Sequence, residues 1–135
     1  MINILPKFRA WDKDSKVMRS WEELIMEKDD GDDFWLIGYR ESRNIVSYDH
    51  DQILMQSTGL KDKNGVEIYE GDIVKFEDGA YSYAGTVEKD DYYFYIQGIY
   101  PETAYSFNDV ADTSNHTADL VVIGNIYENP ELLEK

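Results

Sequence analysis

Short runs of β-branched and aromatic residues, each ended by turn-forming residues, constrain the fold more than any other feature of this chain. Residues 60–76 read LKDKNGVEIYEGDIVKF, with apolar runs at 66–69 and 73–76. Gly71 lies between the two runs, and Asn64 and Gly65 precede them. Asn and Gly tolerate the positive backbone angles of a tight hairpin, so the segment predicts a turn, a strand, a bend and a second strand.

The same punctuation recurs along the chain at a spacing of about ten residues, which is typical of a β-rich domain. Residues 120–123 are apolar on both faces, so they predict a central strand that is covered on both sides. The expected strands cover residues 4–11, 17–18, 34–37, 45–48, 52–58, 66–69, 72–76, 85–88, 92–97, 105–107 and 120–127.

Helix is expected at only two places. Ser20 and Glu23 have the spacing of a capping box, which predicts a short helix through Met26. Near the C-terminus, Asn129 can cap a helical turn that has Pro130 at its first position.

Charge separates the two halves of the chain. The 135 residues carry a formal net charge of −15 and no cysteine, and the halves 1–59 and 60–135 contribute −4 and −11. A negative surface repels nucleic acid and anionic lipid, so the composition disfavours both partners, and it also keeps an aromatic-rich protein soluble. Because no signal peptide or membrane span is visible, we expect a cytoplasmic protein.

Catalytic and metal-binding patterns are missing from the sequence. It has no cysteine, no G-x-S-x-G elbow and no phosphate-binding glycine loop. His50 and His116 lack the spacing of a ligand pair, and residues 62–65 place their glycine too early for a calcium loop. We therefore predict no enzymatic activity, no catalytic residue, no cofactor and no metal.

Tyrosine supplies the best candidate for a contact surface. Seven of the eleven tyrosines lie between residues 81 and 105. On a strand Tyr93 and Tyr95 face one way while Tyr92 and Phe94 face the other, so one pair can fill the core and leave the other for a partner. The alternative is that both faces are covered within the monomer. The predicted interaction surface comprises Tyr81, Tyr83, Tyr92, Tyr93, Tyr95 and Tyr100.

Three blocks resemble the YopX family of phage and prophage proteins: residues 7–12 (KFRAWD), residues 54–65 (LMQSTGLKDKNG) followed by 67–74 (EIYEGDIV), and residues 122–133 (VIGNIYENPELL). The resemblance implies a β-rich fold, an SH3-like barrel in the C-terminal half, and a protein of the bacterial host cytoplasm. No established activity and no functional residue come with it.

Together these observations predict a mainly β protein that borders on the α+β class. Residues 1–57 are expected to form a β-hairpin and short-helix region, packed on an SH3-like, partly open barrel of residues 58–135. The first functional hypothesis is a non-enzymatic interaction module that forms a homo-oligomer or binds a host or phage protein. The alternative is an acidic nucleic-acid mimic that inhibits a host DNA-binding protein.

A third hypothesis is a weak nucleic-acid-binding module of SH3-like fold. It requires the basic residues of the N-terminal hairpin to gather on one face, because binding to a phosphate backbone depends on clustered cations. These residues are Lys7, Arg9, Lys13, Lys16 and Arg19.

Overall fold

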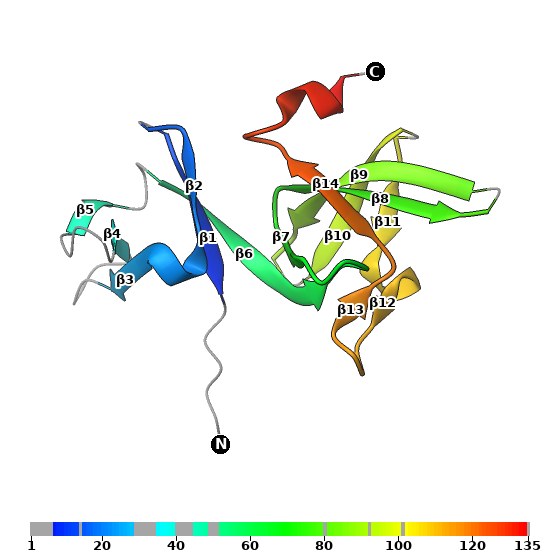
Figure 1. The fold of residues 1–135 in the computed structure, drawn as a ribbon, viewed down its shortest axis with the longest axis horizontal. Helices are drawn as coiled ribbons and strands as arrows, with labels where there is room; N and C mark the ends of the chain where they lie inside the picture. The colour runs from blue at the N-terminus through cyan, green and yellow to red at the C-terminus, as the bar shows by residue number, and fades with distance from the viewer. Residues whose placement is uncertain are drawn as a thin grey trace. The chain divides into compact units, whose positions relative to one another are not determined.

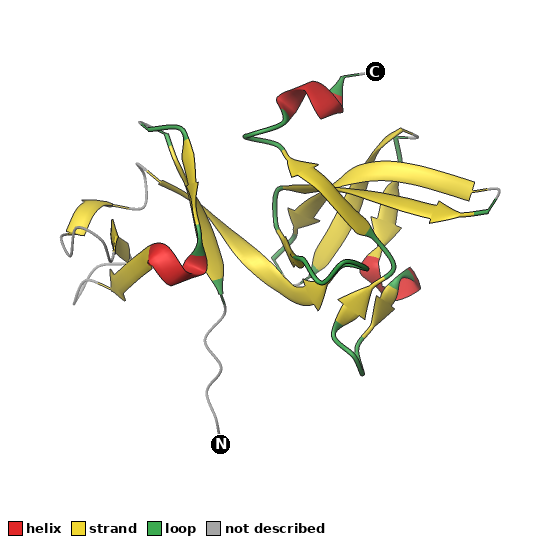
Figure 2. Cartoon of the chain, viewed as in Figure 1, coloured by secondary structure: helices red, strands yellow, loops and turns green. Residues whose placement is uncertain are grey.

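The structure is a computed structural model that describes residues 7–13, 15–28, 35–39, 45–48, 52–79, 81–91, 93–100 and 102–134. The chain divides into two compact units, Met1–Gln56 and Ser57–Lys135. Figure 1 traces their strands in chain order, and Figure 2 shows that strand predominates over helix. The prediction of a mainly β protein is confirmed. The division into separate domains at residues 57 and 58 stays a prediction.

The N-terminal unit is built from antiparallel pairs. β1 pairs with β2 and with the first half of β6, and β4 lies between β3 and β5. Its elements are β1 (Phe8–Asp12), β2 (Val17–Arg19), η1 (Trp21–Glu23), β3 (Leu24–Lys28), β4 (Trp35–Tyr39), β5 (Ile45–Tyr48) and the first part of β6 (Gln52–Lys61).

The hairpin of β1 and β2 forms from the strands expected at residues 4–11 and 17–18. Ala10 is fully buried and packs with Leu24 and Leu54. Asp12 closes the turn, since its carbonyl accepts from the Lys16 N–H at 2.8 Å and its carboxylate accepts from the Ser15 N–H at 3.3 Å. The part of the predicted first strand before residue 7 lies outside the described residues.

The helix predicted through Met26 is wrong beyond its first turn. The Glu23 carboxylate accepts from both the N–H and the hydroxyl of Ser20, so the predicted start is present. The helix nevertheless ends at Glu23 as a short 3₁₀ turn, and Leu24 begins β3. Residues 24–28 pair with β4, and this cross-strand pairing outweighs a weak local preference for helix.

The C-terminal unit contains a five-stranded antiparallel sheet in the order β11-β10-β9-β8-β14. The second half of β6 pairs with β7 and, in parallel, with β13. The elements are β7 (Glu67–Tyr69), β8 (Asp72–Asp78), β9 (Tyr81–Lys89), β10 (Phe94–Tyr100), β11 (Ala104–Ser106), η3 (Phe107–Asp109), β12 (Ala111–Asp112), β13 (Thr117–Ala118), β14 (Val121–Asn125) and η4 (Pro130–Leu133).

The five-stranded sheet is open. Among the described strands no pairing joins β11 to β14, the two ends of the sheet, so it does not close into a barrel. β14 is therefore an edge strand, and the expectation of a central strand at residues 120–123 is wrong. The apolar run has another explanation: Leu120 is fully buried just before the strand, whereas Ile123 is 40% exposed at a bulge against β8.

The glycine-bounded segment at residues 60–76 folds as a turn, a short strand, a bend and a strand, as predicted. The Asp62 carboxylate is almost fully buried and accepts from three backbone N–H groups, those of Asn64, Val66 and Val122, at 2.8–2.9 Å. Of the Asn64-Gly65 pair only Gly65 has a positive φ, and Gly71 has one at the bend before β8. One buried carboxylate thus connects the turn to β14.

The C-terminal turn also forms, with a different use of its cap residue. η4 begins at Pro130, but the Asn129 side chain makes no capping bond and instead accepts from the Asn125 N–H at 3.2 Å. A Cβ on Gly124 would lie 2.6 Å from the Asn129 side-chain oxygen, so a larger residue there requires the Asn129 side chain to shift. None of the helices in the described ranges has the length and apolarity needed to cross a bilayer.

The core of the C-terminal unit lies on one face of the five-stranded sheet, here called the inner face. Paired residues on neighbouring strands project to the same side, and Val87, Ile96 and Tyr105 are paired in this way. Val74 and Ile96 are fully buried in this core, and Phe94 packs against it.

Candidate interaction surface

The opposite face of β9, β10 and β11, here called the outer face, carries polar and aromatic side chains. Tyr95 pairs with Glu88 on β9 and with Ser106 on β11, and Gln97 pairs with Thr86 and Ala104. Because side chains alternate along a strand, these residues project away from the core that contains Ile96. Most of them are exposed or half-buried.

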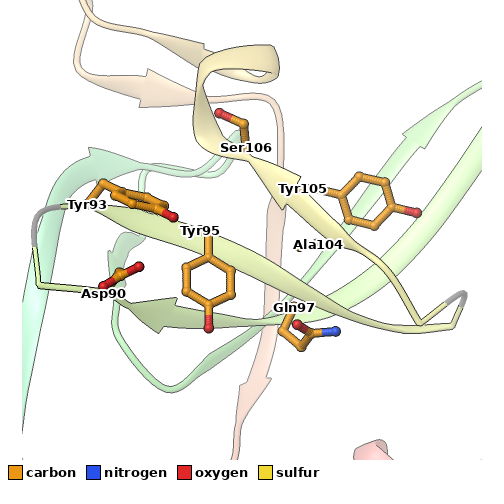
Figure 3. Close-up of a pocket in the computed structure, with 7 residues that line it drawn as sticks. All are labelled: Asp90, Tyr93, Tyr95, Gln97, Ala104, Tyr105 and Ser106. Carbon is orange, nitrogen blue, oxygen red and sulfur yellow. The ribbon is translucent and has the colours of Figure 1, made fainter.

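A hollow of about 470 Å³ lies on this face at the β10–β11 hairpin (Figure 3). Figure 3 shows the rings of Tyr93 and Tyr95 and the Asp90 carboxylate grouped near the start of β10, with Gln97 farther along the strand and the Tyr105 ring turned away from them. The hollow therefore combines aromatic rings, a carboxylate and an amide. Its lining residues are Asp90, Tyr93, Tyr95, Gln97, Ala104, Tyr105 and Ser106.

Tyr93 and Asp90 are coupled at one end of the hollow. The Asp90 N–H donates to the Tyr93 carbonyl at 2.8 Å, which closes the turn between β9 and β10. The Asp90 charge, together with a hydrogen bond between the two side chains, raises the pKa of Tyr93 above its ordinary value. Tyr93 is 58% exposed, and its ring centroid lies 6.1 Å from that of Tyr95. The pair forms an accessible aromatic surface beside a negative charge.

The predicted tyrosines do not form one surface. Tyr83 is only 5% exposed and stacks on Tyr105 with centroids 3.8 Å apart, so including it in an exposed surface is a mistake. Tyr81 is 52% exposed, but it does not line the hollow. Its hydroxyl lies 2.9 Å from that of Tyr105. Tyr92 and the side chain of Tyr100 lie outside the described residues. Tyr93 and Tyr95 come together as the alternation predicted.

The stacked tyrosines at the rim of the inner face have raised pKa values. Burial, with a smaller effect of the Asp109 charge, raises the pKa of Tyr83 to about 12. The hydrogen bond with Tyr81, followed by burial, raises the pKa of Tyr105 to about 12. Both hydroxyls stay protonated well above neutral pH, as expected of structural rather than acid–base groups.

A second, larger hollow of about 610 Å³ continues along the outer face. Gln97 lines both hollows, and Thr86 and Glu88 are joined there by a hydrogen bond of 3.1 Å. Ile126 and Leu133 are among its other lining residues, so the C-terminal segment borders the outer face at this point.

Other chemistry considered from the sequence is not assembled in the described residues. His116 is exposed in the turn between β12 and β13, and His50 lies outside the described ranges. Within those ranges no three His, Asp or Glu side chains are grouped to hold a metal ion. Arg19 pairs with Ala10 across the hairpin, whereas Arg9 is the neighbour of Ala10, so the two arginines project to opposite faces.

Several lining residues of the first hollow were missed from the sequence. Asp90 belongs to a turn and does not follow the strand alternation, so no periodic signal marked it. Gln97 could have been found, because it continues the period of two that Tyr93 and Tyr95 begin. Ala104 and Ser106 depend on the register between β10 and β11, which the sequence alone does not supply.

The fold and the surface define a mainly β protein with an open sheet and an exposed aromatic hollow. Residues 7–134 match the family described as YopX protein, and the chain belongs to that family. No curated protein sequence matches the chain.

Two solved structures are similar to the chain over nearly its whole length. Protein EF1440 from Enterococcus faecalis is 34% identical, with a TM-score of 0.60, and the match covers 98% of this chain and all of that one. Protein yopX from Bacillus subtilis is 26% identical, with a TM-score of 0.64, and the match covers 95% of each chain. Neither description states an activity.

Proposed function

We propose that this protein is a non-enzymatic phage or prophage accessory protein of the bacterial cytoplasm that works by protein–protein interaction, with itself or with a host or phage protein. The observation that carries the proposal is the exposed pair of Tyr93 and Tyr95 beside the hollow on the outer face. Tyrosine suits interfaces because its ring buries apolar area while its hydroxyl stays hydrated. The phage origin and the SH3-like character of the C-terminal sheet rest on the YopX resemblance.

Self-association is the first form of this interaction that we propose. Among the described strands β11 pairs only with β10, so it presents an edge next to the hollow. Unpaired edges and exposed aromatic residues are both features that a second copy can cover. Copies that each carry a formal charge of −15 repel one another, so self-association strengthens as salt screens that charge.

Light scattering coupled to size exclusion tests the proposal from low micromolar to sub-millimolar concentration. The wild type is expected to form a homo-oligomer that Tyr93→Ala weakens about tenfold, as for a central aromatic contact. Val66→Thr is the matched control, since Val66 is 48% exposed but does not line the hollow. A monomer at every concentration would remove self-assembly from the proposal.

Capture of a host or phage protein is tested in cells of the bacterial host. Tagged wild type and Tyr93→Ala are compared after expression in the bacterial host, with Val66→Thr again as the control. A partner recovered with wild type and Val66→Thr but lost with Tyr93→Ala supports the surface. Equal recovery by all three chains would reject it.

The nucleic-acid mimic remains the second candidate, supported by the −11 carried by residues 60–135. Some of that charge is unsuited to the role, because Asp62 and Asp72 are buried and Lys63 and Lys75 pair with Asp119 and Glu77. Direct nucleic-acid binding has less support still, since Arg9 and Arg19 project to opposite faces of their hairpin. Captured partners with a basic DNA-binding groove would favour the mimic.

A further inference from the structure

We propose that the hollow on the outer face binds an arginine side chain from an extended basic segment of a partner protein. The inference rests on the proposed interaction function and names the chemistry of its partner. Its basis is the arrangement of one carboxylate, Asp90, beside two accessible tyrosine rings in a unit of strong negative charge.

The aromatic part of the hollow suits a flat cation. Tyr93 and Tyr95 lie 6.1 Å apart at an interplanar angle of 53°, so the two rings present differently oriented surfaces to one ligand. A guanidinium group stacks on aromatic faces, and its aliphatic stem can pack along the rings at the same time. Arginine fits this arrangement better than lysine, whose compact ammonium stays more strongly hydrated.

The polar part of the hollow provides acceptors for the guanidinium hydrogens. The Asp90 carboxylate accepts from the Asp91 N–H through one oxygen and is hydrogen-bonded to the Tyr93 side chain, and a carboxylate has capacity for further bonds. Gln97 adds a side-chain carbonyl farther along the strand. Among the described residues no lysine or arginine forms an ion pair with Asp90, so a cation at this position meets a negative charge.

At low salt, charge complementarity favours a basic partner over a second copy of this chain as the occupant of the hollow. Residues 60–135 carry −11, and a copy bringing the same charge is repelled at low salt. A basic segment is attracted under the same conditions. The volume of about 470 Å³ is large enough for one long side chain with part of its backbone, and it does not require a deep pocket.

The test uses an eight-residue probe peptide of serine and glycine with one central arginine, and the same peptide with citrulline, which has the same shape and no charge. Binding to the full chain is followed by ¹H–¹⁵N NMR and fluorescence anisotropy at low salt. We expect the arginine peptide to shift the amides of Asp90, Tyr93 and Tyr95, and the citrulline peptide to bind about three- to fivefold more weakly.

Two variants localise the effect. Asp90→Asn is expected to weaken the arginine peptide about three- to fivefold, whereas Asp91→Asn removes the same charge one residue away, outside the hollow, and leaves binding unchanged. Equal affinity for Asp90→Asn and wild type would overturn the proposal. Equal weakening by both variants would overturn it too, because it would show only general attraction to an acidic surface.

The result also separates this inference from the proposed function. Arginine binding must weaken as salt is added, whereas self-association must strengthen. If Tyr93→Ala abolishes self-association or partner capture while the arginine and citrulline peptides bind alike, the interaction function stands and the arginine site is rejected. Tyr93 amide shifts that follow protein concentration, and not the peptide, would assign the hollow to a second copy of the chain.

Discussion

The two faces of β10 show how neighbouring residues acquire different roles. Ile96 is fully buried in the core of the C-terminal unit, while Tyr95, one residue earlier, is half-buried beside an open hollow. The Phe94 ring packs against the core, whereas Tyr93 is 58% exposed. Aromatic residues thus stabilise the sheet on one face and remain accessible on the other, so their number alone did not reveal which of them could meet a partner.

The largest expected effect comes from breaking the inner face. Ile96→Ala should destabilise the protein by about 2–5 kcal/mol, because it removes buried methyl groups and leaves a cavity that the sheet cannot fully close. Urea denaturation gives the difference in unfolding free energy. The neighbouring outer-face change Gln97→Ala should alter it by less than about 0.5 kcal/mol. Similar losses for the two variants would contradict the assignment of the faces.

The next effect contrasts a buried carboxylate with an exposed one. Asp62→Ala leaves the N–H groups of Asn64, Val66 and Val122 without their acceptor and should lower the unfolding free energy by about 2–3 kcal/mol. The loss is no larger because water can hydrate part of the exposed turn. The control is Asp119→Ala, which removes an exposed ion pair with Lys63 that is worth about 0–1 kcal/mol. Urea denaturation of both variants checks the difference. An Asp62→Ala variant with the unfolding free energy of the wild type would contradict the role of the Asp62 carboxylate in holding the turn to β14.

The smallest effect is a pH dependence confined to the alkaline range. The pKa of Tyr83 is about 12 in the folded protein, mainly through burial, and about 10 when unfolded. A raised pKa means that the folded state retains the proton, so this stabilisation is complete below pH 10 and is lost as the pH rises toward 12.

Tyr83→Phe should therefore reduce the fall in the urea midpoint between pH 10 and 12. The outer-face control Tyr95→Phe removes a hydroxyl from a half-exposed ring and should retain the wild-type profile. Parallel profiles for wild type and Tyr83→Phe would show that burial of the Tyr83 hydroxyl on the inner face does not contribute to the loss of stability between pH 10 and 12.

Prediction from the sequence succeeded where local geometry decides and failed where pairing partners decide. The alternation in residues 92–97 correctly separated Tyr93 and Tyr95 from Phe94, and Gly65 and Gly71 marked real turns. Residues 24–26 formed a strand instead of a helix because β4 pairs with them. The apolar run 120–123 became an edge strand, since Leu120 is buried before the strand begins and Ile123 lies at a bulge.

By itself the sequence determined the strand-rich character of this protein, its turns, its negative charge and its resemblance to the YopX family, because each depends on residue type and spacing along the chain. Only the tertiary structure decided that Tyr83 is buried against Tyr105, that Asp62 holds a turn to β14, and that Asp90 lies beside Tyr93 and Tyr95. Those contacts depend on strand register and on turns that bring distant residues together, and a register shift of one residue would turn every side chain to the opposite face.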